Sequence, residues 1–247
     1  MNDMYVYDSA FQNMTATGSA YAASRIISIV QTIMLVQSVV DIGCARGTWL
    51  RQWQAQGVND VIGVDGGYVD RDKLEIAARC FVVHDLATHY DLRRRFDLAQ
   101  SLEVAEHLAP TRAASFVADI VALAPAVLFS AAAPGQGGEN HLNEQPHSYW
   151  RALFRNHGYV AIDCFRPLLA KDAEIPRWYR YNLILYVRRD ELQTITPFAR
   201  MFQLSDQEPI TDTSPFSYKL RKALVRTMPR SACDLLARWN ARRFGVG

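Results

Sequence analysis

Short apolar runs and longer stripes with helical spacing alternate along the chain. Each run ends in polar or glycine-containing positions, which is typical of buried strands, and the stripes predict amphipathic helices. Because strands and helices alternate from Val39 to Phe129, we expect a mostly parallel sheet with helices on both faces. The expected strands are Ser38–Ile42, Val61–Gly66, Phe81–Leu86, Phe96–Ser101 and Ala126–Ser130, and the expected helices are Ser19–Leu35, Thr48–Gln56 and Ala113–Leu123.

The chain beyond the fifth strand predicts a different kind of sheet edge. A flexible loop rich in glycine and polar groups, Pro134–His141, precedes a helix that begins at Ser148 and reaches Phe154. Two apolar runs follow, Val160–Phe165 and Asn182–Val187, and we expect little helix between them. An antiparallel hairpin at the edge of the sheet is therefore predicted.

The stretch Val39–Leu50 is the most informative part of the sequence, since it predicts a strand, a tight glycine turn and a helix start. Gly43 and Gly47 allow positive φ angles and a close approach of the backbone to a ligand. The spacing Gly43-x-x-x-Gly47, with Ala45 between, is not the dinucleotide fingerprint. Asp41 would repel a pyrophosphate but suits an ammonium or sulfonium group, which favours S-adenosylmethionine (SAM) over NAD. Taken alone, the loop leaves a purely structural turn as a serious alternative.

Carboxylates also end the next two strands. Asp65 follows the glycine loop by about twenty residues, where a carboxylate can accept both ribose hydroxyls of an adenosine. Asp65-Gly66 is also a common turn pair, but loop and acid together favour adenosine binding. Asp85 could accept a hydrogen bond from the adenine amino group. The alternative is that Asp85 is an ordinary solvated loop residue.

Glu103, Glu106 and His107 follow the fourth strand, at the expected carboxyl edge of the sheet. On a helix, their spacing would place all three on one face. His141 follows the fifth strand and can reach the same place. Two carboxylates and two imidazoles suit a divalent cation such as Mg²⁺, Mn²⁺ or Zn²⁺. The alternative is a site without metal, in which Glu106, His107 and His141 act as catalytic residues or serve the fold.

Taken together, the motifs resemble class I SAM-dependent methyltransferases between Ser19 and Arg189. Several segments are similar to a bacterial subgroup that often occurs with glycosyltransferases in surface-polysaccharide or natural-product pathways. The resemblance implies a Rossmann-like, doubly wound, seven-stranded sheet with one antiparallel edge strand. Ala45 departs from the family in replacing a common glycine, and Pro146 stands where a tryptophan is expected. The segments that carry the closer resemblance are Gly63–Arg71, Ser101–Leu108, Phe129–Trp150 and Trp178–Arg180.

The resemblance also implies a set of functional residues. Glu103, Glu106, His107 and His141 are similar to the metal site of small-RNA 3′-terminal 2′-O-methyltransferases. We expect methyl transfer from SAM to a hydroxyl of a small molecule or saccharide. The alternatives are metal-dependent methylation of RNA 3′ ends and a non-catalytic SAM-binding partner protein. The cofactor-binding residues implied are Asp41, Gly43, Ala45, Gly47, Asp65, Gly66, Asp85, Leu86 and Ser101.

Composition limits the broad class. The chain has 247 residues, of which 49% are hydrophobic and 21% charged, as in ordinary globular proteins. A net charge of +2 does not indicate a polyanion-binding molecule. The four cysteines form no C-x-x-C pair, and no basic segment with an apolar core opens the chain. Reduced thiols in a cytoplasmic protein are therefore expected.

We divide the chain into a SAM-binding domain at 1–190, with an N-terminal covering helix, and a basic helical extension at 191–247. Residues 1–17 are expected to form a loosely structured lead-in. From Pro215 the composition is strongly basic, with Asp234 as a lone acid and apolar residues at helical spacing. Such helices could rest on an anionic membrane at its inner face, or pack on the domain or on a second copy of the chain. No basic-aromatic motif indicates nucleic-acid binding.

Overall fold

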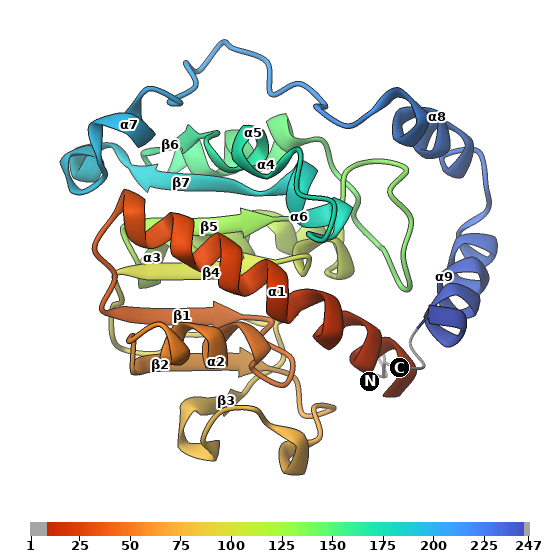
Figure 1. Ribbon diagram of the computed structural model, residues 1–247, viewed down its shortest axis with the longest axis horizontal. Coiled ribbons are helices and arrows are strands. Elements are labelled where there is room, and N and C mark those ends of the chain that lie inside the picture. Colours follow the sequence, from red (N-terminus) through yellow and green to blue (C-terminus); the bar gives the residue numbers. More distant parts are fainter. Residues whose placement is uncertain (1–8, 245–247) are drawn as a thin grey trace.

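A seven-stranded sheet forms the centre of the molecule (Figure 1). The computed structural model describes residues 9–244. Strands run in the order β3-β2-β1-β4-β5-β7-β6, and β1 to β5 are parallel. Strand β7 is antiparallel to both neighbours, β5 and β6, so the predicted antiparallel pair ends the sheet and β7 is the reversed strand. The strands are β1 Ser38–Ile42, β2 Asp60–Asp65, β3 Phe81–Val83, β4 Leu98–Leu102, β5 Ala126–Ser130, β6 Tyr159–Ile162 and β7 Ile184–Arg188.

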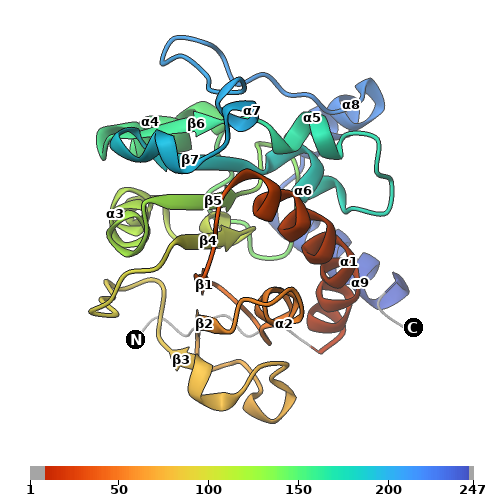
Figure 2. The ribbon, with the colours of Figure 1, turned by 60° about the vertical axis from the view of Figure 1, so that its left-hand side comes forward.

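Helices cover both faces of the sheet, as predicted (Figure 2). One face packs against α1 (Ser9–Ile33) and α2 (Thr48–Ala55), and the other against α3 (Ala113–Leu123) and α4 (His147–Asn156). Apolar side chains of α1 recur three or four residues apart and are fully buried, because that stripe faces the sheet. The central strands are buried on both faces, which explains their continuous apolar runs.

Two expectations about the helices were wrong. Helix α1 begins at Ser9, so residues 9–17 are helical; the first eight residues of the expected lead-in lie outside the described residues. The segment has no apolar stripe, but extending an existing helix needs no new nucleation. Between β6 and β7 lie two short helices, α5 (Phe165–Leu169) and α6 (Arg177–Asn182), where little helix was expected. The α5 turn is held by Arg166, whose buried guanidinium pairs with Asp163.

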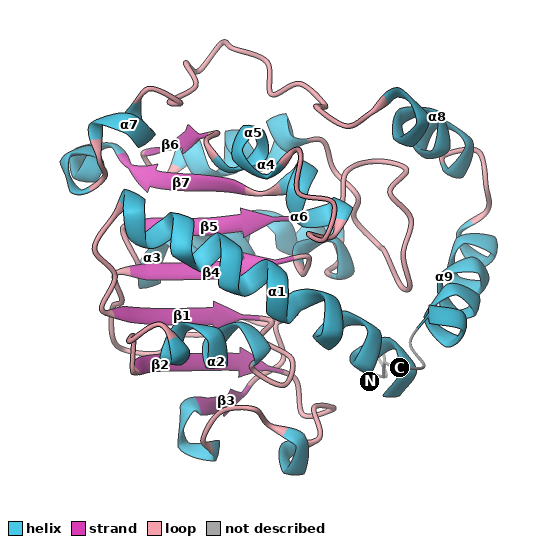
Figure 3. Ribbon diagram, viewed as in Figure 1, coloured by secondary structure: helices cyan, strands magenta, loops and turns pink. Residues whose placement is uncertain are grey.

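The described part of the C-terminal extension contains the α-helices α7 (Pro197–Arg200), α8 (Phe216–Val225) and α9 (Arg230–Phe244) (Figure 3). Isolated bridges from Ile195 to Met34 and from Gln203 to Ile162 join its first part to the sheet domain. Helices α8 and α9 lie beyond the carboxyl ends of the parallel strands, and α9 contacts α1. No described helix meets the length and apolarity needed to cross a bilayer.

Candidate active site

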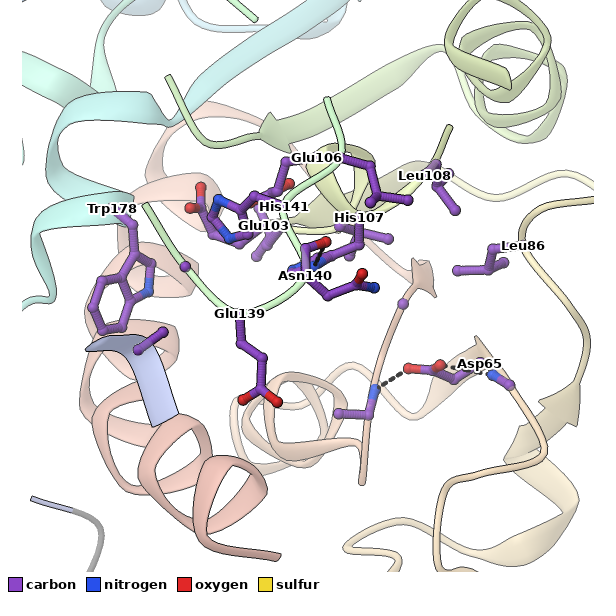
Figure 4. Close-up of a pocket in the computed structure, with 18 of the residues that line it drawn as sticks. Asp65, Leu86, Glu103, Glu106, His107, Leu108, Glu139, Asn140, His141 and Trp178 are labelled. Atoms are coloured by element: carbon purple, nitrogen blue, oxygen red, sulfur yellow. Dashed lines mark hydrogen bonds between the residues drawn. The ribbon is translucent and has the colours of Figure 1, made fainter. Parts of the chain in front are cut away.

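A cavity of about 760 Å³ opens at the carboxyl ends of the parallel strands (Figure 4), within the usual range of about 300–1,000 Å³ for small-molecule sites. Most of the predicted site residues line it. Gly47 and Ser101 do not: Gly47 is the N-cap of α2, and Ser101 is buried within β4. Those that line it are Asp41, Gly43, Ala45, Asp65, Gly66, Asp85, Leu86, Glu103, Glu106, His107 and His141.

The glycine loop is built around left-handed backbone. Gly43 and Gly47 both have φ of 87°, and a Cβ on Gly43 would lie 2.3 Å from Val104 Cγ2. Both glycines are therefore required by the fold of the loop itself. Ala45, where the family often has glycine, also has positive φ (48°), and its amide donates to Asp65 Oδ2 at 2.7 Å. This bond offsets part of the roughly 1–2 kcal/mol that left-handed backbone costs a residue with a Cβ.

Asp65 is held by its surroundings at the end of β2. Besides the Ala45 amide, it accepts hydrogen bonds from the Gly66 amide (2.6 Å) and the Tyr68 hydroxyl (2.5 Å). Burial raises its pKa, and these three donors oppose the increase. An ionised carboxylate has about four acceptor sites, so capacity remains for a ribose hydroxyl.

Asp41 also lines the cavity, in β1 and opposite Gly63 of β2. Burial, and to a lesser extent the charge of Asp65, raise its pKa to about 7. The carboxyl is therefore close to half ionised at neutral pH, and a bound cation would favour its charged form.

The adenine end of the predicted site lies after β3. Asp85 is exposed, and its Oδ1 accepts from the Ala87 amide at 3.0 Å. Leu86 is buried and presents an apolar side chain to the cavity (Figure 4). The pair thus offers a polar edge and an apolar face, which a purine requires.

Glu106, His107 and His141 converge at the opposite side of the cavity from Asp65 (Figure 4). One candidate ligand atom from each lies within 4.8 Å of the others. The expected helical face was wrong, since Ala105–His107 is a single 3₁₀ turn and Glu103, with φ of 58°, still donates its amide to Ser130 of β5. The left-handed backbone at Glu103 prevents an α-helix from starting there.

Glu103 lines the cavity but is held by amide side chains. Its carboxylate accepts from Gln136 at 2.7 Å and from Asn182 at 3.1 Å. It is not one of the three residues whose ligand atoms converge. Its nearness to Glu106 nevertheless affects the cluster, because the two carboxyl groups interact electrostatically.

Glu106 is fully buried, and neither carboxylate oxygen makes a hydrogen bond with good geometry to any described residue. Burial first, and then the charge of Glu103, hold its pKa well above the usual range. Its backbone carbonyl accepts from the amides of Leu142 and Asn143 (2.8 and 2.9 Å), which ties the turn to the segment carrying His141. A buried carboxyl that lacks a hydrogen bond of good geometry can receive a cation or a proton donor.

The two imidazoles are oriented through their Nδ1 atoms. His107 Nδ1 lies 3.3 Å from the Asn140 carbonyl, which can only accept, so Nδ1 carries the hydrogen and Nε2 the lone pair. Burial lowers the pKa of His107 to about 3, so it is neutral at pH 7. His141 Nδ1 lies 2.8 Å from the Glu144 carboxylate, and the rings meet edge to face at 4.9 Å. Such outer contacts are common around metal-binding histidines, and the three donors fit a divalent cation.

The strand order, the glycine loop and the acid after the next strand define a class I methyltransferase fold that binds an adenosyl donor. A family model described as methyltransferase domain matches residues 18–159, and the chain belongs to this family of SAM-dependent methyltransferases. No curated protein matches the chain.

Two solved structures illustrate the fold similarity. An O-methyltransferase family protein from Burkholderia thailandensis is 14% identical with a TM-score of 0.53; the match covers 72% of this chain but only 58% of that one. A sugar N-methyltransferase from Streptoalloteichus is 16% identical with a TM-score of 0.56, over 76% of this chain and 96% of that one. Both similarities concern the fold.

Sequence reasoning missed one wall of the cavity. It comes from the C-terminal helices, which lie outside the matched family segment. Nothing in the basic, amphipathic pattern of the tail indicated which side chains face inward. The tail residues that line the cavity are Arg221, Val225, Cys233, Leu236 and Ala237.

Proposed function

We propose that the chain transfers the methyl group of SAM to a hydroxyl of a small molecule or saccharide. The observation that carries the proposal is the Glu106–His107–His141 cluster, which shares one cavity with Asp41 and Asp65, the acids we expect to bind the adenosyl donor. A methyl sulfonium is already activated, so the protein must mainly align donor and acceptor, which can recover roughly 7–11 kcal/mol of the barrier. A hydroxyl acceptor also has to lose a proton, and the cluster supplies groups for that step.

The cluster's own residues account for proton removal. The neutral imidazole of His107 offers the lone pair of Nε2, because its Nδ1–H donates a hydrogen bond to the Asn140 carbonyl. Glu106 can stabilise the imidazolium that forms, since opposite charge favours the ionised form of both groups. A positioned base of this kind contributes about 10²–10⁴-fold to the rate.

The same three side chains would hold a divalent cation, with Glu106 supplying oxygen and the histidines nitrogen. Such an ion would lower the pKa of the acceptor hydroxyl. Metal dependence is therefore an alternative route to the same product.

Turnover with hydroxyl and amine acceptors tests the proposal. Protein and SAM are incubated with matched pairs of glycosides that differ only in hydroxyl or amino group, and S-adenosylhomocysteine (SAH) is measured by mass spectrometry. We expect SAH to form with hydroxyl acceptors and activity to survive EDTA. Turnover with amines alone would contradict the proposal, and loss of hydroxyl turnover in EDTA, restored by Mn²⁺, would assign proton removal to a metal.

The alternatives give different results in the same assay. An RNA 2′-O-methyltransferase would require an RNA 3′ end and a metal ion. A non-catalytic SAM-binding partner would bind SAH with normal affinity and release none from SAM with any acceptor.

A further inference from the structure

Helix α9 makes polar contacts with the segment that carries His141, here called the His141 loop (residues 134–144). Asp234 accepts a hydrogen bond from the Asn140 amide at 2.9 Å. Arg238 Nε lies 3.1 Å from the buried carboxylate of Glu139. Asn140 has a positive φ of 57°, and its carbonyl contacts His107 Nδ1. The tail therefore contacts the backbone unit that also orients His107.

Helix α8 holds the first part of the same loop. Arg221 Nη1 donates to the Gln136 carbonyl at 2.8 Å, and Arg226 Nε donates to the Pro134 carbonyl at 2.9 Å. These arginines belong to the basic series that suggested an anionic membrane surface. In the structure both arginines donate hydrogen bonds to carbonyls of the His141 loop. Part of the tail's positive charge therefore contacts the chain itself.

Gly135 allows α8 to approach the loop closely. Its φ is 81°, and a Cβ there would lie 2.2 Å from the Lys222 carbonyl oxygen. Gly158, at the turn before β6, has almost the same φ (80°) but nothing within 4 Å of such a Cβ. The two glycines thus share one conformation, and only Gly135 meets the tail.

Inside the loop, these contacts lead to His141. The Gly135 and Gly137 amides each donate to the Glu144 carboxylate at 2.7 Å, and Glu144 also contacts His141 Nδ1 at 2.8 Å. Movement of the Gly135 backbone would therefore move the partner of His141. Beside the loop, Val225, Leu236 and Ala237 face the same cavity.

We propose that α8 and α9 are part of the acceptor site. They hold the His141 loop where His141 faces Glu106 and His107, and they form the apolar wall that an acceptor contacts. Asp234 and Arg238 act as positioning residues through Asn140 and Glu139. This inference depends on the proposed function, which gives His141 its role in the reaction.

The test uses the full chain and two matched pairs of variants. Gly135→Ala and Gly158→Ala place the same strain at equal φ, but only the first meets α8. Asp234→Ala removes the acceptor for the Asn140 amide, whereas Asp234→Asn keeps an oxygen there. Hydrogen exchange reports the protection of residues 134–144, and the NMR signals of the His141 ring, assigned with His141→Gln, report its surroundings.

Gly135→Ala and Asp234→Ala should raise exchange in the His141 loop by about tenfold or more, as expected when a charge-assisted contact is lost. The His141 signals should shift, kcat for methyl transfer should fall, and KM for SAM and the SAH affinity should stay within about twofold. Gly158→Ala should resemble the wild type in all these measurements. Asp234→Asn keeps an acceptor without the charge, so it should recover most of what Asp234→Ala loses.

Unchanged loop exchange and unchanged His141 signals in both Gly135→Ala and Asp234→Ala would overturn the proposal. So would an equal rise in exchange throughout the sheet, since the contacts would then serve only the fold. The proposed function fails in a different way: the wild-type chain would release no SAH with any hydroxyl acceptor, whatever the loop variants do.

Discussion

The two ends of the cavity are built differently. At the cofactor end, Asp41 and Asp65 lie on neighbouring parallel strands, and Asp65 accepts from the Ala45 amide of the glycine loop and from the adjoining Gly66 amide. At the reaction end, Glu106 and His107 lie on a 3₁₀ turn after β4, and His141 lies on a loop that the C-terminal helices contact. Local backbone geometry thus defines the first end, and distant parts of the chain assemble the second.

Because of this difference, we expect substitutions to change kcat and SAH affinity separately. The largest expected effect is at the reaction end: His107→Gln should lower kcat by about 10²–10⁴-fold, because it removes the base. SAH affinity, measured by calorimetry, should not change. His147→Gln is the matched control, since His147 is also buried and neutral, with a pKa lowered by burial to about 4, but lies outside the cavity. Equal losses of kcat in the two variants would show that His107 only serves the fold.

A substitution at the cofactor end should weaken SAH binding and leave the reaction end intact. Asp65→Ala removes the acceptor of three hydrogen bonds and the expected ribose contact. We expect SAH to bind at least about a hundredfold more weakly, since hydrogen bonds to a charged group contribute about 1.5–3 kcal/mol each. Asp85→Ala, at an exposed position, should cost much less. Equal SAH affinities of the two variants in calorimetry would contradict the role of Asp65 at the cofactor end.

The buried acid of the reaction end predicts a pH effect on stability. The pKa of Glu106 is raised on folding, so the folded state binds its proton more tightly than the unfolded state does. Stability should therefore fall as pH rises above the ordinary glutamate range, by up to about 1.4 kcal/mol per pH unit for this group. Urea unfolding of wild type and Glu106→Gln between pH 4.5 and 8 measures the difference. A difference that stays constant with pH would mean that Glu106 ionises normally.

The smallest expected effect concerns Asp41. With a pKa of about 7, this carboxyl should lose a fraction of a proton when the ammonium group of SAH binds at pH 7. Calorimetry in buffers of different ionisation enthalpy measures the released proton. Asp41→Asn should abolish the release, and release that persists in that variant would place its source elsewhere.

The sequence was most informative where function depends on strand ends. Asp41, Asp65 and the left-handed glycine at position 43 lie in short local patterns, and the strand order brings them together as expected. The fold class was confirmed for the same reason, since alternating strands and helices leave few arrangements. The beginning of α1 and the helices between β6 and β7 were missed because their sequences lack a clear apolar stripe.

The reaction end could be predicted only in part. Glu106, His107 and His141 were expected to meet, and they do, but through a 3₁₀ turn rather than a helical face. Glu103 instead accepts hydrogen bonds from Gln136 and Asn182, which come from segments far apart in the chain. The contacts of α8 and α9 with the backbone of the His141 loop likewise left no pattern in the sequence, because backbone amides and carbonyls have no residue-specific signature.

A crystal structure of the full chain with SAH tests the central claim most directly, since it locates both ends of the cavity at once. The account predicts ribose hydroxyls within hydrogen-bond distance of Asp65 and a sulfur atom directed toward Glu106, His107 and His141. A nucleoside bound away from Asp65, or a sulfur facing away from the cluster, would contradict it.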